Sequence, residues 1–268
     1  MLRSLRSELL KISTTRAWWL LALILFVWVG FTAAGIAAFG RVLIDESQGL
    51  IGEEAIPSLV YSSVTAVGYV FPLLFGALAA TTEFRHQTLT PTFLATPRRG
   101  VVLGGKVGAG LLWGAIFGVV GLLASVGIGG LVLGLLGVDL GLGSAEAWAL
   151  IARALLAMAL WSVIGVGLGV LLPNQVAVIV TVLAFTQFLE PLLRMAASFW
   201  EWTSAIGRFL PGAATDALVG SSIYSLVAVD AGGAGTTLEW WQAGLVLCGY
   251  AVVFIGIGAL TTWRRDVT

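Results

Sequence analysis

Six long apolar runs restrict the fold of this chain more than any other feature of its sequence. Each is close to or above the roughly 20 residues that an apolar helix needs to cross about 30 Å of hydrocarbon. The runs are continuously apolar rather than alternating, and a helix satisfies its own backbone hydrogen bonds in lipid, so helices are favoured over barrel strands. The sequence predicts an all-α, polytopic membrane protein with six transmembrane helices. These are expected at residues 17–39, 59–81, 101–131, 148–172, 176–193 and 241–263.

The composition agrees with this class and leaves little outside the membrane. Charged residues make up 10% of the chain and the mean hydropathy is +1.00, whereas a soluble domain carries about a quarter charged residues. We therefore expect residues 1–268 to form a single transmembrane domain.

The cations are sorted along the chain in a way that predicts its orientation. If the N-terminus is cytoplasmic, ten of the 14 cations but only three of the 14 acids fall at inner segments. Lys and Arg flanks are retained on the cytoplasmic side, so both termini are expected there. The inner cations are Arg3, Arg6, Lys11, Arg16, Arg85, Arg98, Arg99, Lys106, Arg264 and Arg265.

The third run is the hardest to delimit, because residues 101–138 contain no charge except Lys106. Two spans there would send Arg264 and Arg265 outside, against the sorting of cations. We therefore expect one long span that tilts or ends in an outer helix.

The N-terminal segment, residues 1–16, has the pattern of a short amphipathic helix. Its apolar residues recur at spacings of three and four, with basic residues on the other faces, which predicts a helix along the inner leaflet. A cleavable signal sequence is the alternative, but the following apolar run exceeds the usual signal core. The apolar residues are Leu2, Leu5, Leu9 and Ile12.

Groups for catalysis or metal binding are scarce. His86 is the only histidine and Cys248 the only cysteine, so a zinc site or a Cys/His pair is not expected. We expect Cys248 to be a packing residue inside its span. No metal and no cofactor is expected on this chain.

One segment imitates a phosphate loop. Residues 100–107 have its glycine and lysine spacing, but Val107 replaces the Ser or Thr that would hold magnesium, and no strand precedes the segment. Lys106 is expected to reach the headgroups instead. The chain is therefore expected not to be an enzyme, and any ATP hydrolysis would occur on a partner.

Polar residues near the outer side form a second group. Glu190 and Arg194 stand four apart with Gln187 one turn earlier, which favours an ion pair within one helix; a translocation or subunit contact is the alternative. The outer segment, residues 195–239, is too long for a turn. Its first half predicts one or two short helices in the outer leaflet, acting as a cap or a gate.

Glycines recur every four residues in two of the predicted spans. This spacing lets a neighbouring helix approach closely. We expect packing within one subunit, with a dimer seam as the alternative. The residues are Gly110, Gly114 and Gly118, and Gly165 and Gly169.

The inner segment, residues 83–100, carries the polar residues that we single out. Apolar side chains between positions 84 and 94 can share one helix face, Pro97 ends the helix, and Arg98-Arg99-Gly100 turns back to the membrane. This predicts a short helix parallel to the inner surface. A basic loop on anionic lipid is the alternative.

The order of residues in this segment resembles the inner loop between spans two and three of ABC-2 type transporter permeases. The N-terminal segment and the Trp-rich first span are similar to actinobacterial members of that family. The resemblance covers essentially the whole chain. It is carried by Glu83, Thr88, Leu94, Ala95, Thr96-Pro97, Arg98-Arg99 and Gly105-Lys106, and by Ser7-Glu8-Leu9-Leu10-Lys11 followed by Thr14-Thr15-Arg16.

The resemblance implies a multi-pass permease of the bacterial cytoplasmic membrane, with a second permease chain in a homo- or heterodimer. It further implies two cytoplasmic ABC ATPase subunits that hold ATP and Mg, lipid around the spans, and no nucleic acid. The inner segment would be a coupling helix that docks on the ATPase. The coupling residues would be Glu83, Phe84, Arg85, His86, Thr88, Leu89, Pro97, Arg98 and Arg99.

In that arrangement Glu83, Arg85 and His86 would be polar contacts, whereas Phe84 and Leu89 would fill the ATPase cleft. Arg98 and Arg99 would hold the loop on lipid. The expected function is ATP-driven export of an amphipathic or hydrophobic solute, such as a drug, a lipid or a peptide antibiotic, because few charges line the spans. The alternatives are a non-transporting scaffold or sensor that binds an ATPase, an intramembrane enzyme, and a carrier driven by an ion gradient.

Overall fold

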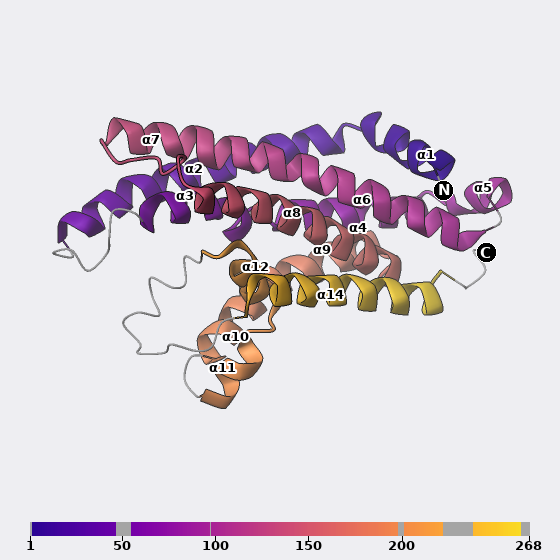
Figure 1. Cartoon of the computed structure of the whole chain (residues 1–268). Coiled ribbons are helices and arrows are strands. Elements are labelled where there is room, and N and C mark those ends of the chain that lie inside the picture. Colours follow the sequence, from indigo (N-terminus) through magenta and orange to yellow (C-terminus); the bar gives the residue numbers. More distant parts are fainter. Residues whose placement is uncertain (1, 47–54, 97, 198–200, 222–237, 264–268) are drawn as a thin grey trace.

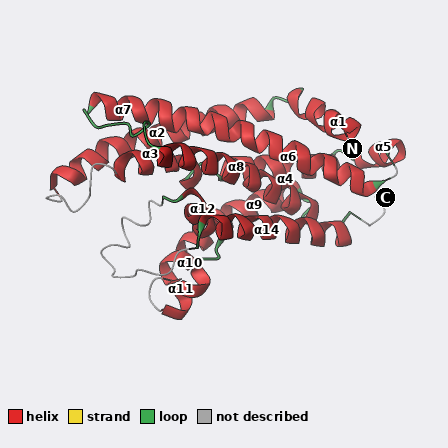
Figure 2. Ribbon diagram, in the orientation of Figure 1, coloured by secondary structure: helices red, strands yellow, loops and turns green. Residues whose placement is uncertain are grey.

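The computed structural model describes residues 2–46, 55–96, 98–197, 201–221 and 238–263. Within these ranges every regular element is a helix, and none is a strand (Figure 2). Six helical stretches are long and apolar enough to cross a membrane, which confirms the predicted class and number. The protein is thus an all-helical chain with the features of a multi-pass membrane protein.

Several of these spans are built from more than one element. The spans are α2 (Ala17–Glu46), α3 (Ala55–Ala66) with α4 (Val70–Arg85), α6 (Arg99–Leu122) with the π-helix η1 (Leu123–Gly129) and α7 (Gly130–Leu135), α8 (Ala145–Leu171), α9 (Gln175–Ala184) with the π-helix η2 (Phe185–Leu189) and α10 (Glu190–Ala197), and α14 (Trp240–Thr261). The shorter helices are α1 (Leu2–Ser13), α5 (Leu89–Ala95), α11 (Glu201–Gly207) and α12 (Pro211–Val219).

The third apolar run is a single helical stretch, as expected, and it continues to Leu135 without a reversal. The segment that imitates a phosphate loop lies inside α6 and is helical. One or two short helices are expected in the first half of the outer segment, residues 195–239, and the structure has α11 there and α12 extending just beyond it. Its glycine-rich second half lies outside the described residues.

Helix α8 is the centre of the bundle and packs against α4, α6 and α14. Small residues allow these contacts. A Cβ on Gly165 would come within 2.0 Å of the Leu73 carbonyl oxygen on α4, and one on Gly114 of α6 would come within 2.8 Å of the Ala159 backbone. The predicted glycine faces therefore pack within this chain.

Local caps define where some of the helices begin. The Ser144 hydroxyl accepts from Ala147 N at 3.2 Å at the start of α8. The Asn174 side chain accepts from the first turn of α9, and Glu239 with Gln242 forms a capping box on α14. Each cap satisfies backbone N–H groups that the helix itself leaves unpaired.

The tryptophans in the middle of the spans differ in burial. Trp113 and Trp161 are buried between helices, but Trp28 is exposed. Cys248 is also exposed, so its expected packing role within the chain is wrong. Both lie on spans that are apolar on every side, and such helices give no periodic signal for the side that faces the bundle.

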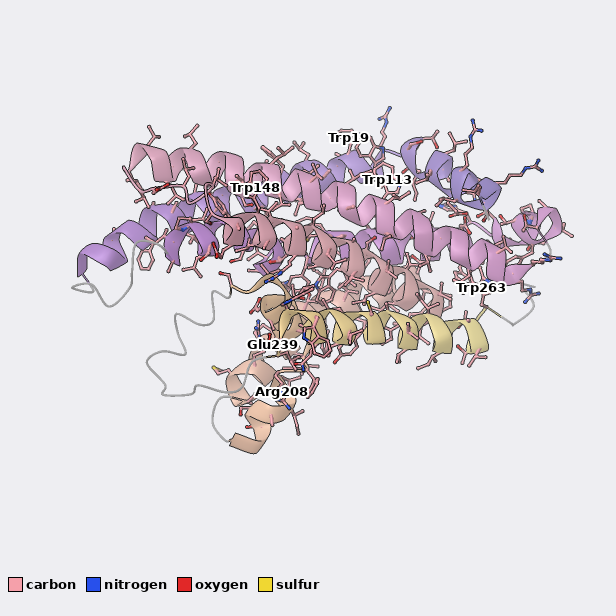
Figure 3. All side chains as sticks on the ribbon, in the orientation of Figure 1. Trp19, Trp113, Trp148, Arg208, Glu239 and Trp263 are labelled. Atoms are coloured by element: carbon pink, nitrogen blue, oxygen red, sulfur yellow. The ribbon has the colours of Figure 1, made fainter. Side chains whose placement is uncertain are left out.

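The molecule has two distinct ends (Figure 1). Helices α1 and α5 and the end of α14 lie together at one end, which we call the α5 end, whereas α7 lies at the opposite end. Figure 3 places Trp263 at the α5 end and Trp148 toward the α7 end. Indoles at both ends of the spans are typical of residues at the two membrane interfaces.

Candidate functional site

The chain turns at the α5 end between α4 and α6. Helix α4 continues to Arg85 and then stops, so the single helix expected from residue 84 to 94 is interrupted. The stop is made by Gln87, which has a left-handed φ of 54°, and by Thr88 N, which donates to the Glu83 carbonyl at 3.1 Å. This is the hydrogen-bond pattern of a Schellman motif, in which Gly or Asn usually occupies the left-handed position.

The buried face of α5 packs against Trp263, which follows the end of α14. Leu89 is fully buried with Val102 and Trp263, and the Phe93 and Trp263 rings meet edge-on at 5.3 Å. Arg99 Nη1 donates to the Trp263 carbonyl at 3.0 Å, and Trp263 Nε1 donates to the Arg99 carbonyl at 3.2 Å. A displacement of α5 would therefore reach α4, α6 and α14 together.

The apolar side chains exposed at this corner are not the ones predicted to contact a partner. Leu89 is enclosed by this chain, and Phe84 is half-buried with its ring 6.0 Å from Trp263. As the structure stands, neither is presented as a knob for a partner's cleft. The interruption at residues 86–88 changes the rotation of the helix, and Leu94, 80% exposed, is instead the apolar residue on the surface.

The polar residues predicted for coupling are likewise partly exposed and partly buried. Arg85, His86, Thr88 and Arg98 are exposed, and Arg99 is half-buried. Arg85 Nη1 donates to Gln175 Oε1 at the start of α9 at 2.9 Å. Pro97 lies outside the described residues. Glu83 is buried and so does not form part of this surface.

Glu83 belongs to an ion-pair cluster that joins three helices. We call Glu8 and Lys11 of α1, Glu83 of α4 and Lys106 of α6 the inner charge cluster. Lys11 Nζ lies 2.7 Å from a carboxylate oxygen of Glu8 and 2.7 Å from Glu83 Oε1. Lys106 Nζ lies 2.9 Å from Glu8 Oε2 and 2.7 Å from Glu83 Oε2, the latter at an angle outside that of a regular hydrogen bond. Each cation contacts both acids, so the formal charges cancel.

The prediction that Lys106 reaches the headgroups is wrong, because α1 covers it and leaves 3% of its side chain exposed. A glycine on α6 permits this approach. A Cβ on Gly105 would lie 2.4 Å from Ser4 Oγ and 3.2 Å from the Ser4 backbone. A buried ammonium is costly unless it is paired, and Glu8 and Glu83 supply that pairing.

The cluster also perturbs Lys11, which lies outside the membrane spans. Partial burial lowers the pKa of its ammonium, but hydrogen bonds and attraction to Glu8 and Glu83 outweigh this, so the pKa of Lys11 is raised. The cation is therefore charged throughout the physiological pH range.

A second polar site joins α10 and α12 nearer the outer segment. The expected ion pair between Glu190 and Arg194 gives way to contacts with α12. Arg194 Nη2 pairs with Asp216 Oδ2, and Glu190 Oε1 accepts from the backbone N–H of Gly212. These partners lie 22 residues along the chain, which a pattern within one helix does not reveal.

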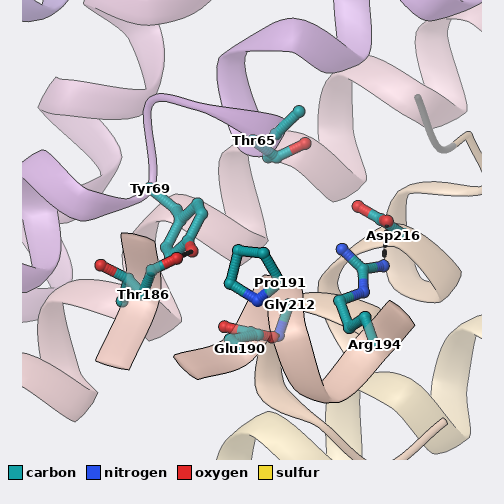
Figure 4. Close-up of a pocket in the computed structure, with 9 residues that line it drawn as sticks. Thr65, Tyr69, Thr186, Glu190, Pro191, Arg194, Gly212 and Asp216 are labelled. Carbon is teal, nitrogen blue, oxygen red and sulfur yellow. Dashed lines mark hydrogen bonds and ion pairs between the residues drawn. The ribbon is translucent and has the colours of Figure 1, made fainter. Parts of the chain in front are cut away.

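Glu190 lines a small pocket, which we call the outer pocket. Its cavity volume is about 20 Å³, and Figure 4 shows Tyr69 and Thr186 on one side of Glu190 and the Arg194–Asp216 pair on the other. Gln187, which was grouped with Glu190 in the sequence, is exposed and is not part of the lining. The lining residues are Thr65, Ala66, Tyr69, Thr186, Glu190, Pro191, Arg194, Gly212 and Asp216.

Sequence reasoning missed three participants in these sites. Glu8 and Lys11 stand three apart, a spacing that signals an ion pair on one helix, but nothing in the sequence connects them to Glu83. No pattern in the sequence predicts that Asp216 takes part in a site. The described residues contain no group of three or more His, Cys, Asp or Glu side chains that could hold a metal ion.

Comparison with protein-family models and with curated proteins finds no match to this chain.

Proposed function

We propose that this chain is the membrane-spanning subunit of an ATP-driven exporter of the ABC-2 type, and that its α5 corner receives force from a separate cytoplasmic ATPase. The observation that carries the proposal is the way the corner is built. Helix α5 is joined by the chain to two spans, α4 and α6, and is held to a third, α14, through Trp263. A rigid element attached to several spans can convert a push at one end into tilting of the bundle.

The inner charge cluster supports the same proposal. It connects α1 to α4 and α6 beside the corner, with all four charges matched. Paired and buried charges hold helices in one relative position, because any separation leaves a charge unpaired at low dielectric. A corner that is fixed in this way transmits displacement instead of absorbing it.

The exposed residues of the α5 corner, namely Leu94, Arg85, His86 and Thr88, are the contact surface that we propose for the ATPase. They combine one large apolar side chain with several polar ones, as many protein interfaces do. In this proposal Glu83 and Leu89 keep the corner folded and do not contact the ATPase.

The proposed cargo is an amphipathic or hydrophobic solute, with ATP and Mg on the ATPase and a second permease chain completing the path. The spans contain few ionisable side chains, so a strongly polar cargo would meet a large desolvation barrier. The proposed location is the bacterial cytoplasmic membrane, with the α5 end in the cytoplasm.

The test uses two leucines of nearly equal exposure at opposite ends of the molecule. Leu94 is 80% exposed on α5 and Leu135 is 79% exposed on α7. An ATPase with a phosphate loop, taken from a neighbouring reading frame, would be titrated against the full chain in lipid nanodiscs. Leu94→Ser is expected to weaken its binding by about tenfold or more, since a buried leucine contributes about 1.5–3 kcal/mol.

Leu135→Ser is the matched control and should leave the affinity unchanged. Equal affinities for Leu94→Ser and the parent chain would overturn the proposed surface. ATP hydrolysis by the reconstituted complex then separates the alternatives. Stimulation by an exported solute supports transport, no response to any solute supports a scaffold or sensor, and solute movement that follows an ion gradient without ATP supports a carrier.

A further inference from the structure

The outer pocket contains a buried acid that is only half satisfied. Glu190 is 2% exposed, and one of its oxygens accepts from Gly212 N. Its other oxygen, Oε2, is fully buried and has no hydrogen-bond partner in the part of the chain that the structure describes. An acid within a span is expensive to keep, and such residues usually mark a binding site or an ion path.

The volume of the outer pocket limits which chemical group of a ligand can enter it. Its volume of about 20 Å³ holds roughly one group the size of a water molecule. A primary ammonium has this size and carries three N–H donors, whereas a quaternary ammonium is larger and has none. Tyr69 and Thr186 line the same pocket. Their hydroxyls donate to the Thr186 and Val182 carbonyls, and a hydroxyl that donates can also accept.

The charge of the lining agrees with this choice. Arg194 pairs with Asp216, whereas Glu190 has no ion pair among the described residues and accepts from the backbone of Gly212. A cationic group would supply Glu190 with a counterion. An anionic group would be repelled by it, and a neutral group would leave it without a counterion.

The position of the pocket in the fold favours an amphipathic ligand. Glu190 lies within the candidate span formed by α9, η2 and α10, which is apolar enough to cross a membrane. A ligand that binds there needs an apolar part besides its charged head.

We infer that the outer pocket binds the primary ammonium group of an amphipathic amine. The inference deepens the proposed function by naming a cargo class, and it rests on that function only in treating the amine as cargo. Binding itself requires neither the ATPase nor transport.

The experiment measures equilibrium binding of radiolabelled n-hexylamine to the full chain in nanodiscs of zwitterionic lipid. Saturable binding with one site per chain is expected. Glu190→Gln should weaken it by about tenfold or more, because a hydrogen bond to a charged group is lost. Glu146→Gln, the same change at an exposed acid in the first turn of α8, should bind like the parent chain.

Three competitors test the chemistry of the site. Hexyltrimethylammonium and n-hexanol should fail to displace the label, since one lacks N–H donors and the other lacks charge. Sodium or potassium chloride should displace it no better than choline chloride of the same ionic strength. Specific displacement by an inorganic cation would assign the pocket to that ion and overturn the inference.

Equal affinity in the parent chain and Glu190→Gln would also overturn it, provided that both unfold at the same temperature. If Glu190→Gln fails to fold, Thr186→Val, which removes another acceptor in the pocket, takes its place with the same expected direction. Because these measurements use the chain alone, their failure leaves the proposed permease function to its own binding test.

Discussion

The inner charge cluster and the outer pocket both bury acids, but they treat those acids differently. Glu8 and Glu83 each contact both Lys11 and Lys106, whereas Glu190 shares one oxygen with a backbone amide and leaves the other without a partner among the described residues. A chain with few charges thus uses its buried acids in two ways. Complete pairing fixes helices to one another, and incomplete pairing leaves a group that can recognise a ligand.

Loss of the Lys106 charge should lower the free energy of unfolding more than any of the other substitutions below. Lys106→Met should lower the free energy of unfolding by about 3–5 kcal/mol, because Glu8 and Glu83 lose their shared buried partner. Equilibrium unfolding in mixed micelles measures this. The double variant Lys106→Met/Glu83→Leu keeps the Glu8–Lys11 pair and should recover at least half of the loss. A single variant as stable as the parent chain would refute the cluster.

The same substitution, Glu to Gln, should destabilise the two sites unequally. Glu83→Gln should lower the free energy of unfolding by about 3 kcal/mol, because two cations lose a partner. Glu190→Gln should lower it by less than about 1 kcal/mol, since Oε1 keeps the bond from Gly212 and no ion pair of Oε2 is lost. Equal losses in the same unfolding assay would remove the distinction between the sites.

Substitution of the glycines next to the two sites should have a smaller effect on stability. A Cβ on Gly105 would crowd both the side chain and the backbone of Ser4, whereas a Cβ on Gly212 would meet only side-chain atoms, those of the Glu190 carboxyl group. Gly105→Ala should therefore destabilise the chain by about 1–3 kcal/mol, and Gly212→Ala by less. Thermal unfolding compares them, and the opposite order would contradict the packing of α1 on α6.

The smallest effect is a pH dependence at Lys11, whose side chain is 43% exposed. The pKa of Lys11 is higher in the folded chain than in the unfolded chain. The stability that the charged ammonium contributes is therefore fully present below the unfolded pKa of about 10.4. It is lost as the pH rises through the folded pKa. The difference in unfolding free energy between the parent chain and Lys11→Met should be below about 1 kcal/mol.

That difference should stay constant from about pH 7 to about pH 10 and shrink at higher pH. Unfolding of both chains across this range is the measurement. A difference that disappears between pH 7 and pH 9 would show that the carboxylates do not hold the charged form of Lys11.

The number of spans was predictable because length and hydropathy alone decide which segments can cross a bilayer. The one-piece third span was predictable from the sorting of charges. The rotation of each span was not, as Trp28 shows, because a helix that is apolar all round carries no record of which side faces its neighbours. The exposed or buried state of a residue then depends on tertiary packing.

The two sites were predictable only in part, for the same reason. The α5 corner was found from its polar sequence, but Gln87 in a left-handed conformation gave no warning that α4 ends there, since Gly or Asn is the usual signal. Lys106 and Glu8 are 98 residues apart in the chain. Their pairing depends on how three helices rotate and approach, which a single sequence does not specify.

In the proposed function the α5 corner lies in the cytoplasm, where an ATPase can reach it. Leu94→Cys and Leu135→Cys, each in a Cys248→Ser background, would be labelled with a membrane-impermeant maleimide in intact cells and in inside-out vesicles. We expect Leu94→Cys to react only in inside-out vesicles and Leu135→Cys only in intact cells. Labelling of Leu94→Cys in intact cells would contradict it.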